Sequence, residues 1–134
     1  MATKQTPSLD TNVLLRLIVR DNAQMLEKAR KLLDEHEVFA VADQAIIEIV
    51  YVLGGHYGYS RHEVADVVKA LIDNQHLNLN RPLFERVLPH YRKHSSLSFT
   101  DCCLEAYATL NQQTPLYTFD TKLAKQLTGA RLID

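Results

Sequence analysis

Apolar and polar positions along the chain form a pattern of short apolar runs separated by longer stretches with helical spacing. Apolar residues that recur every three or four positions predict helices, and short apolar or alternating runs predict strands. The predicted helices span residues 22–36, 43–53, 60–75, 82–93, 98–111 and 120–127. The predicted strands span residues 38–41, 76–80, 115–119 and 131–133, and residues 13–19 are expected to lead from a first strand into a helix.

Residues at the predicted helix ends support these boundaries. Ser60 followed by Glu63 is a capping-box pattern, and Gly54 with Gly55 ends the preceding helix. Pro82 suits the first turn of its helix, whereas Pro89 is expected to bend or break it.

Strands separated by helices predict an α/β fold with parallel pairing, in which helices cover both faces of a central sheet. Ligands of such sheets bind at the carboxyl ends of the strands. With 134 residues, 46% of them hydrophobic and 23% charged, the chain predicts one globular domain over residues 1–134, with its core from about residue 7.

Composition also limits where the protein works. No apolar run approaches the roughly 20 residues that span a bilayer, and no hydrophobic stretch precedes Asp10. The two cysteines, Cys102 and Cys103, are neighbours and cannot build a disulfide framework. We therefore expect a cytoplasmic protein that does not enter a membrane.

Three aspartates stand where an α/β fold places its ligands. Asp10 follows the first strand, Asp120 follows the strand over residues 115–119, and Asp101 lies in the first turn of its helix. Each also has a structural interpretation. Asp10 and Asp120 are suitable N-caps, and Asp101 lies three residues after Ser98, as in a capping box.

Glu48 is harder to explain as structure alone. It lies in a helix that is apolar on nearly all sides, so we expect it to be buried and in need of a partner. That partner is a basic side chain from elsewhere in the fold, a shared proton or a metal. If all four carboxylates converge, a hard divalent cation offsets their repulsion, and oxygen ligands favour Mg²⁺ or Mn²⁺.

Net charge neither requires nor excludes a nucleic-acid substrate. The formal charge is −1, but setting the four carboxylates aside leaves 12 acidic residues against 15 basic ones. The remainder of the chain is therefore compatible with a polyanion.

Four segments contain the candidate acids in order along the chain: residues 9–14 (LDTNVL), Glu48 in its apolar helix, residues 99–102 (FTDC) and residues 118–124 (TFDTKLA). Together these segments resemble the PIN-domain ribonucleases, and most of all the VapC-type toxins of bacterial toxin–antitoxin pairs. The resemblance implies a parallel sheet and Mg²⁺- or Mn²⁺-dependent cleavage of RNA. It also implies a homodimer and inhibition by a small cognate antitoxin.

The resemblance also implies roles for individual residues. Asp10 and Asp101 would be the principal metal ligands, and Asp120 and Glu48 would complete the acidic catalytic cluster. Two further residues, Asn12 and Thr118, match positions that support the acids or line the site.

Two other groups of residues have simpler interpretations. Glu105 lies one helical turn after Asp101 and is expected to be solvated or salt-bridged rather than a supplementary acid. His90 and His94 have the i, i+4 spacing of some zinc sites, but no third ligand is apparent, so a basic, solvent-facing helix segment is the better interpretation.

Three alternatives to a ribonuclease toxin remain. An aspartyl phosphatase of the haloacid-dehalogenase kind needs a second Asp two positions after Asp10, where this chain has Asn12. A second alternative is a non-catalytic module with an acidic, metal-binding pocket, such as a phospho-acceptor domain. Such a domain requires paired acids near the first strand, and this sequence does not clearly have them. A PIN-like domain that processes RNA outside a toxin system has the same motifs.

Overall fold

The computed structural model describes residues 5–134, which form seven helices and four short strands. In chain order these are α1 (Thr11–Val19), α2 (Ala23–Glu35), β1 (Phe39–Ala40), α3 (Asp43–Gly55), α4 (Arg61–Asp73), β2 (Leu77–Asn78), α5 (Arg81–Lys93), α6 (Phe99–Leu110), β3 (Leu116–Thr118), α7 (Thr121–Gln126) and β4 (Ala130–Leu132). The predicted alternation of helices and strands is confirmed, with strands shorter than expected. The start of the chain differs most, because residues 11–19 are entirely helical and Ser8 alone bridges to Ala40.

Capping residues set the helix starts as expected. Ser60 opens α4 and Ser98 opens α6, each through a complete capping box. Pro89, in contrast, does not break α5, which runs on to Lys93. The predicted break was therefore wrong, because α5 buries an extensive apolar face, which offsets the one backbone hydrogen bond that proline removes. That face consists of Leu83, Phe84, Val87, Leu88 and Tyr91.

The strands pair in parallel, as predicted, but they do not form one central sheet. β1 pairs with β2, with Phe39 opposite Leu77, and β3 pairs with β4 in a separate two-stranded sheet. The fold class is α/β, whereas the expectation of a single sheet covered on both faces was wrong. The local sequence pattern identifies strands but does not say which strand lies beside which.

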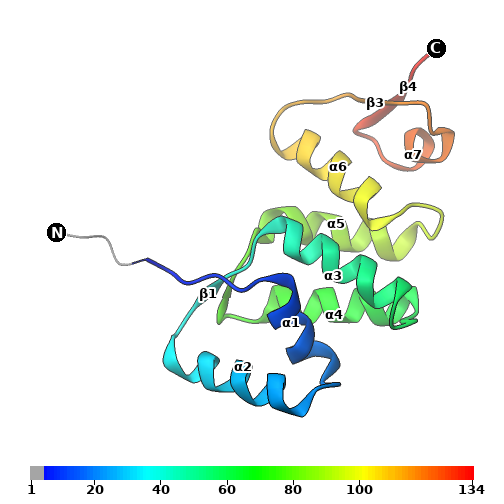
Figure 1. The fold of residues 1–134 in the computed structure, drawn as a ribbon. Coiled ribbons are helices and arrows are strands. Elements are labelled where there is room, and N and C mark those ends of the chain that lie inside the picture. Colours follow the sequence, from blue (N-terminus) through cyan, green and yellow to red (C-terminus); the bar gives the residue numbers. More distant parts are fainter. Residues whose placement is uncertain (1–4) are drawn as a thin grey trace.

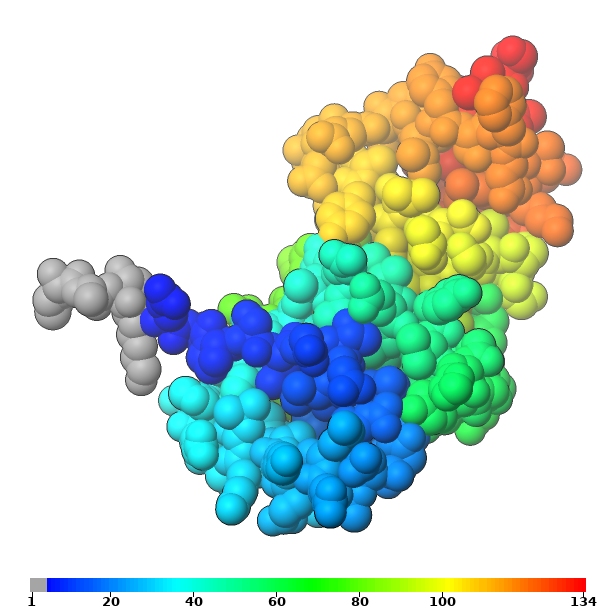
Figure 2. Space-filling model, viewed as in Figure 1, coloured from blue at the N-terminus to red at the C-terminus, as the bar shows by residue number. Residues whose placement is uncertain are grey.

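Helix α6 separates the two sheets. Figure 1 shows α1 to α5 with the β1–β2 sheet on one side of α6, and β3, α7 and β4 on the other. We call residues 116–132, which contain these last three elements, the C-terminal unit. In the space-filling view of Figure 2 this unit lies at the upper right, beyond α6 and away from α1 and α2.

One hydrophobic core nevertheless extends through both parts. Leu83, Phe84 and Val87 of α5 are fully buried, and they belong to the same cluster as Leu127, which is also fully buried, and Leu123 of the C-terminal unit. No helix in residues 5–134 is both long and apolar enough to cross a membrane.

Candidate functional site

Asp10 caps α1 at the end of the first extended segment. Its Oδ1 accepts a 2.9 Å hydrogen bond from the backbone N–H of Val13, while its Oδ2 accepts none from the residues that the structure describes. Asn12, in the first turn of the same helix, is exposed.

Glu48 projects from the middle of α3 and is exposed, so the expectation that it is buried was wrong. The helix has a solvent-facing stripe formed by Gln44, Glu48 and Tyr51, at the i, i+4, i+7 spacing of a single helical face. Thr11 Oγ1 donates a 2.6 Å hydrogen bond to Glu48 Oε2, and Gln44 Nε2 donates a longer one, 3.4 Å, to Oε1. Glu48 therefore has hydrogen-bond partners, and none of them is basic.

Asp101 and Asp120 are both held by helix starts. Asp101 is half-buried, and its Oδ2 accepts a 3.1 Å hydrogen bond from the backbone N–H of Ser98. Asp120 caps α7 through Oδ1, which accepts from the backbone N–H groups of Lys122 and Leu123 at 2.9 and 3.3 Å. Thr118 Oγ1 accepts from the backbone N–H of Asp120 at 2.9 Å, so it fixes the turn that presents this carboxylate.

Each of the three aspartates uses only one carboxylate oxygen for its structural role. The second oxygen of each accepts no hydrogen bond from residues 5–134. Capping and ligand binding therefore do not compete here. The helix N-terminus orients the carboxylate, and the remaining oxygen is available to a cation.

The four acids do not form one cluster within a single chain. The Thr11–Glu48 hydrogen bond brings the start of α1, where Asp10 lies, against the middle of α3. Asp120, however, belongs to the C-terminal unit on the other side of α6 (Figure 1). Among the described residues, no three His, Cys, Asp or Glu side chains are close enough together to hold a metal ion.

Glu105 is the carboxylate that is actually buried. Its side chain is 0% exposed, and Arg86 of α5 pairs with it at 3.3 Å. Its Oε2 also accepts a 3.1 Å hydrogen bond from the backbone N–H of Gly129. Glu105 was expected to be solvated or salt-bridged, and the structure shows the salt bridge.

The close approach of the C-terminal unit to α6 depends on glycine. A Cβ at Gly129 would lie 2.7 Å from Thr109 Oγ1 and 2.9 Å from Glu105 Oε2, distances at which something must shift. Gly129 just before the predicted last strand is the sequence signal for a close backbone approach, but it does not reveal that a glutamate is the partner.

A second polar contact ties α6 to α3. Tyr107 donates its hydroxyl proton to Asp43, in the first turn of α3. Burial, followed by this hydrogen bond, raises the pKa of Tyr107 to about 12. The phenol therefore stays protonated at neutral pH and keeps donating.

His90 and His94 stack with their ring centroids 6.1 Å apart near the end of α5. Burial lowers the pKa of His90, and no third metal ligand joins the pair among the residues described. The segment was expected to be basic and to face solvent. Arg92 and Lys93 are exposed, whereas both histidines are half-buried.

The family is decided by a comparison with protein-family models. The model of the PIN domain matches residues 8–126, which include all six candidate site residues. The chain belongs to the PIN-domain family. PIN domains are generally nucleases, and they typically use divalent metal ions. No curated protein matches this PIN domain closely enough to identify a relative.

Proposed function

We propose that this PIN domain is a Mg²⁺- or Mn²⁺-dependent endoribonuclease of the cytoplasm, and that it is the toxin of a toxin–antitoxin pair. The proposal rests on the positions and hydrogen bonds of the aspartates inside the segment that the PIN-domain model matches. Asp10, Asp101 and Asp120 each lie at a helix start with one oxygen engaged and one available. Family membership supports the nuclease activity, and the sequence resemblance described above supports the toxin role.

The donor chemistry fits a hard divalent cation, because every candidate ligand is a carboxylate oxygen. When bound, such a cation would lower the pKa of a coordinated water and neutralise charge on the scissile phosphate. Among the described residues no three of these side chains lie close enough together to hold an ion, and Asp120 lies in the C-terminal unit, on the other side of α6 from the start of α1.

The protein's own residues would prepare the site. Thr11 and Gln44 hold the two oxygens of Glu48, and the helix N–H groups of α1 and α7 orient Asp10 and Asp120. Thr118 fixes the turn before Asp120. These contacts lower the entropic cost of arranging several acidic side chains around one ion.

The decisive experiment replaces Asp10 with Asn. Asparagine is also a good N-cap, so Asp10→Asn should leave α1 and the stability of the fold nearly unchanged. Because it removes a negative ligand, Mg²⁺-dependent cleavage of an RNA substrate should fall by about a hundredfold or more. Asp34→Asn, at an exposed position on α2, is the matched control and should cleave like the parent. If Asp10→Asn also cleaves like the parent, the proposed site is wrong.

The toxin role has its own test. Expression of the chain alone in bacteria should arrest growth, and co-expression of an open reading frame adjacent to its gene should restore growth. Asp10→Asn should remove the toxicity. Unimpaired growth with the wild-type protein confirmed in the soluble fraction would contradict the toxin role and leave a PIN nuclease that processes RNA.

A further inference from the structure

The extended segment at residues 8–10 has one free edge. Leu9 donates its N–H to the carbonyl of Ala40 at 3.0 Å, and Ala40 donates to the carbonyl of Pro7 at 2.8 Å. Backbone groups of successive strand residues point to opposite edges, so the carbonyl of Ser8 and the amide of Asp10 point away from β1. Neither of these groups has a backbone partner among the residues described.

Strand β3 has a free edge of the same kind. Leu116 donates to Gly129 at 2.7 Å and Ile133 donates to Thr118 at 2.9 Å, so the backbone groups of Tyr117 point away from β4. The side chains along this sheet are unusually exposed for apolar residues. Tyr117 is 60% and Phe119 80% exposed. Proteins normally cover an unpaired edge that is flanked by apolar side chains.

The two free edges match each other. With Leu9 opposite Tyr117, Tyr117 N–H would donate to Ser8 and Asp10 N–H would donate to Tyr117, as in any parallel pair. The two small sheets would then become one, and both strands would leave the sheet at the same end. Asp10 and Asp120 would therefore lie close together at that end.

Contacts within the chain oppose such pairing by the same copy. The C-terminal unit is fixed against α6 by the burial of Leu123 and Leu127 and by the hydrogen bond between Gly129 and buried Glu105. In the structure β3 lies on the other side of α6 from residues 8–10 of its own chain (Figure 1), whereas a second copy can approach the exposed edge and leave these contacts intact.

We propose that β3 of one chain pairs with residues 8–10 of a second copy, so that Asp120 of each chain completes the carboxylate site of the other. Each copy carries both edges, so a two-fold dimer forms two identical junctions and closes. The consequence for catalysis rests on the proposed nuclease function, whereas the pairing itself does not.

Cysteine cross-linking tests the pairing without any activity. In the proposed register Ser8 lies beside Leu116, at a spacing that suits a disulfide. A mixture of Ser8→Cys and Leu116→Cys chains should form a mixed disulfide dimer on mild oxidation. The native Cys102 and Cys103 can remain, because burial raises their pKa values to about 11 and about 12. Replacing Leu116→Cys with Gln24→Cys, on the exposed surface of α2, is the control and should give no mixed dimer.

A single chain that carries both Ser8→Cys and Leu116→Cys separates the two possibilities. A cross-linked dimer supports the proposal, whereas a disulfide within a monomer shows that the edges meet in one chain and overturns it.

The solution mass supplies a second test. Tyr117→Pro removes only the outward N–H of β3, because the bonds to β4 come from Leu116 and Thr118. We expect light scattering to show a dimer for the parent and for Tyr117→Val, and a monomer for Tyr117→Pro. The proteins are measured at about 50 μM, well above the dissociation constant of a micromolar complex. A monomeric parent at this concentration would contradict the proposal. An unchanged dimer for Tyr117→Pro would contradict it as well.

Complementation tests whether the sites are shared. Asp10→Asn and Asp120→Asn chains are each expected to be inactive, but a mixed dimer contains one site with both aspartates intact. Random exchange makes half of the dimers mixed, so the mixture should regain about a quarter of the parent's cleavage rate. No recovery, with the parent active and subunit exchange verified, would overturn the shared site. A cross-linked dimer whose parent form lacks nuclease activity would instead contradict only the proposed function.

Discussion

Thr11 follows Asp10 in the chain, and its Oγ1 donates a 2.6 Å hydrogen bond to Oε2 of Glu48. Hydrogen bonds of this kind fix the orientation of a metal-binding carboxylate, and their loss typically costs about 10- to 100-fold in metal affinity or activity. Thr11 is therefore a positioning residue for Glu48, at a position for which the sequence offered no role.

Replacing Thr11 with Val keeps the shape of the side chain and removes the hydroxyl. We expect Thr11→Val to raise the Mn²⁺ concentration required for half-maximal RNA cleavage by about tenfold or more, with an unchanged melting temperature. Thr11→Ser keeps the donor and should restore the parental metal dependence. If Val and Ser variants behave alike, Thr11 does not act through Glu48.

Glu48 and Glu105 show what the sequence can and cannot reveal about single residues. Glu48 was expected to be buried because its neighbours in α3 are apolar, yet Gln44 and Tyr51 share its exposed stripe, and that polar spacing was present in the sequence. Glu105 gave no comparable signal, because its burial depends on Arg86 and Gly129, which are distant in the chain. Local patterns predict a helix face, whereas pairing across the fold depends on tertiary packing.

At the scale of elements, Arg61 joins the start of α4 to the end of α5. Its guanidinium donates to the carbonyls of Tyr91, His94 and Leu97 at distances between 2.6 and 2.9 Å, and it lies 3.8 Å from the centroid of the Tyr91 ring. These carbonyls lie at and beyond the end of α5, where the helix itself provides no donors.

Arg61→Met should lower the free energy of unfolding by about 2–4 kcal/mol, because it takes the guanidinium donor from the carbonyls of Tyr91 and Leu97. Lysine cannot reproduce the forked geometry, so Arg61→Lys should recover only part of the loss. Urea denaturation measures both. Arg61→Met at parental stability would show that water replaces the guanidinium without cost.

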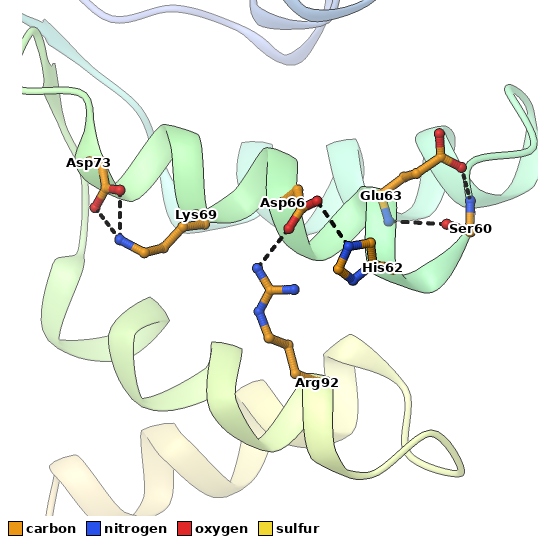
Figure 3. A network of polar contacts seen from close by, with 7 residues as sticks. All are labelled: Ser60, His62, Glu63, Asp66, Lys69, Asp73 and Arg92. Atoms are coloured by element: carbon orange, nitrogen blue, oxygen red, sulfur yellow. Dashed lines mark hydrogen bonds and ion pairs between the residues drawn. The ribbon is translucent and has the colours of Figure 1, made fainter.

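Arg92 is the matched control on the same pair of helices. Figure 3 shows it reaching from α5 to Asp66 of α4, within a surface network that includes His62. The Arg92–Asp66 distance is 2.9 Å, but the two side chains are 35% and 57% exposed. Exposed pairs contribute little, so Arg92→Met should change stability by less than about 1 kcal/mol.

Elements were largely predictable where the local sequence determines them. The capping boxes at Ser60 and Ser98 located two helix starts, and Asp10 and Asp120 located two more. The arrangement of strands was not predictable, because any two of these short apolar runs can pair. The separation of β3 and β4 from β1 therefore appears only in the structure.

At the scale of the whole molecule, one buried charge helps to attach the C-terminal unit, beside the packing of Leu123 and Leu127. Glu105 is 0% exposed and contacts both Gly129 and Arg86, whose own side chain is 30% exposed. The two partners are unequal in one respect. If its partner is lost, the Arg86 side chain can turn toward water, whereas the Glu105 carboxylate stays buried and cannot be hydrated.

This asymmetry predicts an order of stability among three variants. Arg86→Met leaves a buried carboxylate without its cation, which should cost about 3–5 kcal/mol. Glu105→Gln keeps an acceptor for the N–H of Gly129 and frees a partly exposed arginine, so it should cost only about 1–2 kcal/mol. The double variant Arg86→Met with Glu105→Met replaces the pair by apolar groups and should be more stable than Arg86→Met alone.

Urea denaturation gives this order, and limited proteolysis shows where the molecule loosens. Cleavage of Arg86→Met should begin in the connection at residues 111–115, because the C-terminal unit loses its polar anchor on α6 and is then held by the packing of Leu123 and Leu127 in the core that it shares with α5. A loosened unit would also be free to reach residues 8–10 of its own chain. Arg86→Met should therefore form the Ser8–Leu116 disulfide within one chain as well as between chains. If it forms only the disulfide between chains, the anchor at Glu105 does not decide which copy β3 joins.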